Sequence, residues 1–277
     1  MSILIHDFQA ASSPSASEVA LPRRSKRRKA RSLLRRYVRL SLRHTWLNPL
    51  ILVLVVLALY AINPSTSNPF YSCIFLSYPL PRSVKDVATF APVQYGKGKA
   101  DFAFVAFYAI VLSFAREFVM QRILRPLSIR AGIKNRGKQA RFMEQAYTAM
   151  YFSIYGPFGM YVMSRTPVWY FNTTGMFEGF PHRSHEGLFK AYYLLQASYW
   201  AQQGLVLLLM LEKPRKDFKE LVLHHVVTLA LIWLSYRFHF AYMGIAVFIT
   251  HDISDFFLAV SLVIIPHFPP TSSLSPY

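Results

Sequence analysis

The chain has 277 residues, of which 53% are hydrophobic and 16% aromatic, and its formal net charge is +18. The apolar residues gather in continuous blocks close to the roughly 20 residues that a bilayer-spanning helix needs, which disfavours both a soluble domain and an alternating β-barrel. The single cysteine, Cys73, excludes an intramolecular disulfide framework. We therefore expect an all-α, polytopic membrane protein.

The N-terminal region, residues 1–45, is predicted to be a basic and largely disordered cytosolic tail. It lacks the pattern of a cleavable signal peptide, and the run Arg23 to Arg31 is almost entirely basic. A basic cluster beside a membrane span attracts anionic lipids of the cytosolic leaflet and helps to fix topology. This position favours a membrane role for the cluster over nucleic-acid binding, so we expect no nucleic-acid partner.

Hydrophobic segments predict about six transmembrane helices. Two spans, a lumenal loop rich in proline and serine, and a basic cytosolic loop make up a region of residues 46–139. Residues 140–265 hold the other four spans, and residues 266–277 form a separate tail. The predicted spans, in chain order, are 46–62, 102–120, 142–163, 188–211, 220–240 and 242–265.

Lysine and arginine are distributed asymmetrically over the predicted loops. The N-terminal tail and loops 122–141 and 212–219 are basic, and an alternating six-span map puts them on one side, whereas loop 165–187 is nearly neutral. The excess of positive charge in cytosolic loops therefore predicts a cytosolic N-terminus. The neutral loop is then lumenal, and its triplet Asn172-Thr173-Thr174 makes Asn172 a candidate glycosylation site.

Two neighbouring spans carry ionisable side chains where hydrocarbon makes them costly. His224 and His225 lie near the start of span 220–240, and His251, Asp252 and Asp255 lie in the middle of span 242–265. Ionisable residues inside spans usually face a protein interior or a wet cavity and mark a functional site. Because the two spans are joined by only a few residues, they should be antiparallel neighbours, which makes these five residues the candidate catalytic set.

Two chemistries fit this set. An imidazole can act as a base or nucleophile while a carboxylate orients it. Alternatively, the histidines and aspartates could bind a divalent metal, although adjacent histidines diverge by about 100° on a helix and suit one ion poorly. We expect no metal and no cofactor. Further along the span of the paired histidines, Thr228, Ser235 and Tyr236 are predicted to bind substrate.

The sequence resembles the longevity-assurance ceramide synthases, whose signature forms the core of the TLC domain. The resemblance runs in family order from about Leu33 to Ser261 and is closest to the fungal branch. The motifs that carry it are His224-His225-Val-Val-Thr228, His251-Asp252-Ile-Ser-Asp255, Arg125-Pro126-Leu, Arg141-Phe-Met-Glu144-Gln145, Gly187-Leu-Phe-Lys190-Ala-Tyr192-Tyr193, Tyr199-Trp200-Ala-Gln202-Gln203 and Glu212-Lys213-Pro-Arg-Lys216-Asp217.

This resemblance implies an N-acyltransferase of the endoplasmic reticulum membrane that uses fatty acyl-CoA as co-substrate and makes (dihydro)ceramide from a sphingoid long-chain base. It implies a helical barrel around a lipid tunnel and an acyl-histidine intermediate, with His224 as the acylated residue and His225 as the alternative. His251, Asp252 or Asp255 would orient the histidine and take the proton from the amine. The implied protein partners are a small single-span regulatory subunit and a homodimer or heterodimer.

From about Ser261 the sequence leaves the family pattern. We expect an incomplete TLC-type barrel from a truncated or mis-spliced form. The 277-residue chain is expected to be unstable or inactive, whereas its longer parent is expected to be active. Three alternatives stay open: a non-enzymatic TLC protein of the lipid-sensing or translocon-associated kind, a catalytically dead fragment, and a metal-dependent lipid enzyme. The paired histidines and the His-Asp-x-x-Asp motif favour the acyltransferase.

Overall fold

The computed structural model describes residues 26–82, 87–209 and 218–264. The chain divides into two compact units, Met1–Leu42 and Arg43–Tyr277. In the first unit, α1 (Lys26–Arg43) is a helix within the tail that we predicted to be largely disordered. Leu33, Leu34 and Leu42 are exposed among its arginines. Such a basic amphipathic helix is typical of segments that lie on a membrane surface.

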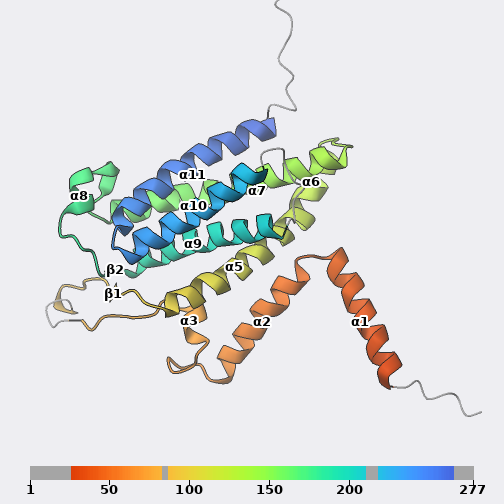
Figure 1. Ribbon diagram of the computed structural model, residues 1–277, viewed down its shortest axis with the longest axis horizontal. Helices are drawn as coiled ribbons and strands as arrows, with labels where there is room; N and C mark the ends of the chain where they lie inside the picture. The colour runs from red at the N-terminus through yellow and green to blue at the C-terminus, as the bar shows by residue number, and fades with distance from the viewer. Residues whose placement is uncertain (1–25, 83–86, 210–217, 265–277) are drawn as a thin grey trace, which may run out of the picture. The chain divides into compact units, whose positions relative to one another are not determined.

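The second unit consists of helices and one small pair of antiparallel strands, as the all-α prediction requires (Figure 1). The strands are β1 (Gln94–Tyr95) and β2 (His185–Glu186). The helical elements are α2 (Leu47–Ile62), α3 (Tyr71–Ile74), α5 (Ala100–Val119), η1 (Met120–Leu124), α6 (Arg125–Arg130), α7 (Arg136–Ser164), η2 (Trp169–Phe171), α8 (Thr173–Phe177), α9 (Gly187–Leu208), α10 (Phe218–Arg237) and α11 (Ala241–Ile264).

Five long helices form the bundle that positions the polar residues. In Figure 1, α5, α7, α9, α10 and α11 run side by side, and direct contacts join α7 to α11, α5 to α9, and α9 to α10. The short helix α3 and the N-terminal span α2 pack on α5. Helix α9 is therefore the central element, because it touches each of the other four.

Tyrosines of α9 fill the middle of the core. Tyr192 and Tyr193 are 0% and 1% exposed and pack among aromatic residues of α7 and α11. Glycines make the room for them: a Cβ at Gly159 of α7 would collide with the Tyr192 hydroxyl, and one at Gly244 of α11 with the Tyr193 hydroxyl. The close approach of three helices thus depends on the absence of two side chains.

Lys190 of α9 forms a buried ion pair with α5 and also ties the segment between α2 and α5 to the bundle. The Lys190 ammonium lies 2.7 Å from the Asp101 carboxylate and donates to the backbone carbonyls of Ser77 and Gly96. We predicted this segment as a plain loop, but it holds α3 and β1, and β1 pairs with β2. A one-turn helix and a two-residue strand are too short to produce a detectable hydrophobic period.

Two further basic side chains at this end of the bundle have lowered pKa values. Burial, followed by the charge of nearby Lys190, lowers the pKa of Lys97 to about 8. Burial, followed by the charge of Lys97, lowers the pKa of His185 to about 3. The His185 ring is sandwiched between Phe189 and Tyr242, and neither ring nitrogen has a hydrogen-bond partner among the described residues.

Each of the six predicted spans contains a helix, but the predicted number of spans is not confirmed. Within the described ranges, three helical stretches are long and apolar enough to cross a membrane, or four if α1 and α2 count as one broken span. The three are Ala100–Arg130, Phe218–Arg237 and Ala241–Ile264. Helix α2 is short at 16 residues, and the remaining two predicted spans, in α7 and α9, carry more polar residues.

Candidate functional site

The paired histidines lie on α10 against a tryptophan of α9. The His224 and His225 rings are 5.7 Å apart at 84°, and the Trp200 indole lies 6.1 and 6.0 Å from them. The Nδ1 of His225 is 2.9 Å from the carbonyl oxygen of Leu221, one turn earlier. A carbonyl only accepts, so Nδ1 carries the proton and the lone pair is on Nε2. His225 therefore presents a basic nitrogen, whereas His224 is exposed.

The aspartates of α11 lie at the same level as these histidines. Helices α10 and α11 are separated by only three residues, so residues at equal distances from the connection face each other in an antiparallel pair. Counting from residue 239, His224 and Asp255 are almost level, and Asp255 interacts electrostatically with His251 and His224. The exposed His251 donates from Nδ1 to the Val247 carbonyl, 2.9 Å away. The structure thus brings the two predicted motifs together.

Asp252 is the most enclosed of the predicted catalytic residues. It is 0% exposed, and its Oδ2 accepts hydrogen bonds from Gln196 Nε2 at 2.5 Å and from the Tyr192 hydroxyl at 3.4 Å. The other carboxylate oxygen, Oδ1, is buried and has no hydrogen-bond partner within the described part of the chain. A buried acceptor without a partner is costly and calls for an explanation.

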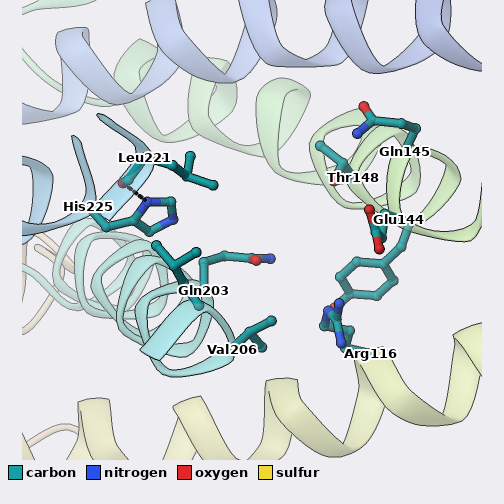
Figure 2. Close-up of a pocket in the computed structure, with 10 residues that line it drawn as sticks. Arg116, Glu144, Gln145, Thr148, Gln203, Val206, Leu221 and His225 are labelled. Carbon is teal, nitrogen blue, oxygen red and sulfur yellow. Dashed lines mark hydrogen bonds between the residues drawn. The ribbon is translucent and has the colours of Figure 1, made fainter. Parts of the chain in front are cut away.

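A cavity of about 160 Å³ opens beside His225, between α5, α7, α9 and α10. Figure 2 shows the His225 ring and the Gln203 side chain on one side, with Glu144 and Thr148 of α7 facing them. It is lined by Arg116, Glu144, Gln145, Tyr147, Thr148, Gln203, Val206, Leu207, Leu221 and His225.

The predicted substrate-binding residues are not gathered around this cavity. Thr228 is about one turn from His224 on α10, whereas Ser235 and Tyr236 are about three turns from His224. There the Ser235 hydroxyl bonds to that of Tyr193, and the Tyr236 hydroxyl donates to Asp101 at 2.9 Å. Ser235 and Tyr236 thus hold the opposite end of the bundle together.

The candidate glycosylation residue is accessible. Asn172 is exposed at the start of α8, and its side-chain oxygen accepts a hydrogen bond from the Thr174 amide.

No metal-ligand set forms among the described residues: no three or more histidine, cysteine, aspartate or glutamate side chains are placed to hold an ion.

Sequence reasoning missed the contribution of α9. Tyr192, Gln196, Trp200 and Gln203 follow one another at intervals of three or four residues and face Asp252, the histidines and the cavity. This spacing was visible in the sequence as a polar and aromatic stripe within an apolar helix. The resemblance gave Trp200 and Gln203 as matches but assigned no role to them.

Comparison with known proteins agrees with this arrangement. A family model described as the TLC domain matches residues 141–265. Residues 141–265 therefore match a TLC domain. This domain contains the paired histidines, both aspartates and the α9 stripe, which together make up the candidate site.

Several curated relatives are named as fungal sphingosine N-acyltransferases or ceramide synthases, as the resemblance predicted. The chain is 55% identical over 79% of its length to "Sphingosine N-acyltransferase-like protein FUM17" of Gibberella moniliformis, covering 57% of that protein. It is 48% identical over 90% of its length to "Sphingosine N-acyltransferase lac1" of Schizosaccharomyces pombe, covering 64%. It is 43% identical over 81% of its length to "Ceramide synthase LAG1" of Saccharomyces cerevisiae, covering 53% of that protein. The chain thus spans between about half and two thirds of these relatives' lengths.

Proposed function

We propose that the chain provides the catalytic centre of a ceramide synthase. The reaction transfers a fatty acyl group from acyl-CoA to the amine of a sphingoid long-chain base and gives (dihydro)ceramide. The observation that carries this proposal is the placement of two histidines and two aspartates on neighbouring helices of a TLC domain, with His225 lining a cavity. The names of relatives that are 43% to 55% identical support the same reaction.

The proposed chemistry proceeds through a histidine. A ring nitrogen attacks the thioester carbonyl, the carbon–sulfur bond breaks, and CoA leaves as a thiolate while an acyl-imidazole forms. The sphingoid amine gives its proton to a base, attacks the acyl carbon and displaces the imidazole, which leaves an amide. We propose His224 as the acyl carrier. His225 is the alternative, because its Nε2 lone pair is fixed by the bond of Nδ1 to Leu221.

The acidic residues complete the proposed centre. Asp255 is placed to stabilise positive charge on His224 or His251 as the imidazole is acylated or protonated. His251 or an aspartate would take the proton from the amine, since an ammonium group is not nucleophilic. Asp252 is the deeper of the two carboxylates, with one oxygen held by hydrogen bonds and the other buried without a partner among the described residues.

The cellular setting that we propose follows from the relatives and the charge pattern. The protein would be a multi-pass protein of the endoplasmic reticulum with a cytosolic N-terminus, and its six spans would form part of a TLC-type barrel. A cytosolic mouth near His224 suits a water-soluble CoA headgroup, whose phosphates could meet the basic loops. A single-span regulatory subunit, self-association or pairing with a similar chain, and glycosylation of Asn172 belong to the same proposal.

The test is an acyltransferase assay in membranes from fungal cells that lack their own ceramide synthases. Two forms are expressed: the 277-residue chain, and a chimera in which it replaces the matched 254 residues of S. pombe lac1. We expect N-acyl product from acyl-CoA and dihydrosphingosine with the chimera, and none after the joint change of His224→Ala and His225→Ala. A chimera that folds but makes no product would contradict the function and favour a non-enzymatic TLC protein.

A further inference from the structure

A glutamine of α9 holds the buried carboxylate of the site. Gln196 is 0% exposed, and its Nε2 donates to Asp252 Oδ2 at 2.5 Å and to the Tyr192 hydroxyl at 3.0 Å. The Tyr192 hydroxyl donates to the same aspartate oxygen. Helix α9 thus directs two donors at one oxygen of Asp252.

The orientation of the Gln196 amide is fixed from its other side. Its Oε1 accepts a hydrogen bond from the Tyr151 hydroxyl of α7 at 3.4 Å. Tyr151 is in turn immobilised, because its ring stacks on Tyr199 at 3.8 Å and on Tyr155 at 4.2 Å. With its oxygen turned towards Tyr151, the amide must present its N–H groups to Asp252.

We propose that Gln196 is a positioning residue for acyl transfer, which holds the Asp252 carboxylate so that only Oδ1 remains to accept a proton or hydrogen bond from a substrate or histidine. This inference rests on the proposed function. It assigns Gln196 a role through Asp252, since nothing places the amide itself against the reacting atoms.

The network is better explained by positioning than by packing alone. A glutamine in a fully buried site costs free energy unless it is hydrogen-bonded, and a leucine would fill a similar volume without that cost. Here all the bonds of the amide serve to orient one carboxylate across three helices, α7, α9 and α11. The Gln196 and Tyr192 donors both bind Oδ2 of Asp252, so its Oδ1 is left without a partner among the described residues. Precise placement of such a group affects rate strongly, since a misplacement of about 1 Å can cost roughly 100-fold.

The test compares Gln196→Leu with Gln202→Leu in the chimera described above. Gln202 is a matched control: it is on the same helix, is 1% exposed, and neither end of its amide has a hydrogen-bond partner among the described residues. We expect Gln196→Leu to lower kcat by roughly 10- to 100-fold while KM for either substrate changes by less than about threefold, because the substrates do not touch the amide. Gln202→Leu should keep both constants within about threefold of the unaltered protein, since it removes no bond to Asp252.

A second variant keeps the test decisive if Gln196→Leu fails to fold. Gln196→Glu has the same shape but brings a carboxyl group against Asp252, so we expect a comparable loss of kcat with folding retained. The inference is overturned if a folded Gln196→Glu or Gln196→Leu variant keeps the kcat of the Gln202→Leu control, or if its loss is in KM alone. Absence of product from the unaltered chimera would instead refute the proposed function, so the two failures are distinguishable.

Discussion

The Lys190–Asp101 pair should contribute strongly to stability because it is buried. The side chains of Lys190 and Asp101 are 1% and 4% exposed. In Asp101→Asn, Lys190 keeps two backbone carbonyls but loses the opposite charge. Removing one partner of a buried ion pair typically costs about 3–5 kcal/mol. At about 2–4 °C per kcal/mol for a chain of this size, the unfolding midpoint should fall by roughly 6–20 °C.

The assay is thermal unfolding of detergent-solubilised protein followed by size-exclusion chromatography. The control is Arg165→Gln, which breaks the Arg165–Glu186 pair, whose arginine side chain is 43% exposed. Surface pairs contribute about 0–1 kcal/mol, so the control should hardly change the midpoint. The joint change of Asp101→Leu and Lys190→Met should recover much of the loss, because no charge is left unpaired. Equal midpoints for Asp101→Asn and Arg165→Gln would refute the reasoning.

Three other predictions concern packing, pH and modification. Gly156→Ala in α7 should stabilise the protein by up to about 1 kcal/mol, because a helical alanine there meets nothing within 4 Å. Gly159→Ala should destabilise it by about 1–3 kcal/mol through collision with Tyr192. Thermal unfolding midpoints that shift in the same direction for Gly156→Ala and Gly159→Ala would contradict the packing. Since burial lowers the pKa of His185 to about 3, the unfolded chain binds a proton there between pH 6.5 and 3 that the folded chain does not. The free energy of unfolding should therefore fall as the pH is lowered through that range. His185→Phe should make this dependence on pH less steep, and a slope that the substitution leaves unaltered would contradict the assignment to His185. Endoglycosidase should increase the gel mobility of the protein expressed in fungal membranes but not that of Asn172→Gln, and a mobility that enzyme treatment leaves unchanged would exclude glycosylation.

The sequence predicted what depends on hydrophobic blocks and local motifs. The helical class follows from continuous apolar segments, and the adjacency of α10 and α11 follows from the short connection between two spans. That His224 is level with Asp255 was not predicted, because we expected the aspartates to lie deeper than the histidines. The number of spans does not follow as readily. Helices α7 and α9 carry buried polar side chains, such as Gln196 and Lys190, that bond inside the bundle rather than facing lipid.

The parts that could not be predicted depend on contacts between distant segments. Tyr236 was assigned to substrate, but its hydroxyl bonds to Asp101, 135 residues earlier in the chain. Gln196 was given no role, because the spacing of the α9 stripe shows that it shares a face with Trp200 but not that this face meets Asp252. Side-chain direction on a helix is periodic, but the identity of the facing helix is a property of the tertiary structure.

Mass spectrometry of the α10 peptide, residues 218–237, tests the central claim most directly. The chimera is incubated with isotopically labelled acyl-CoA in the absence of sphingoid base, then digested. We predict an acyl adduct on His224 or His225 that disappears when dihydrosphingosine is added and reappears as N-acyl product. The adduct should be absent when both histidines are changed to alanine. Formation of product without any adduct, or an adduct that persists in the doubly changed protein, would contradict acyl transfer through this histidine pair.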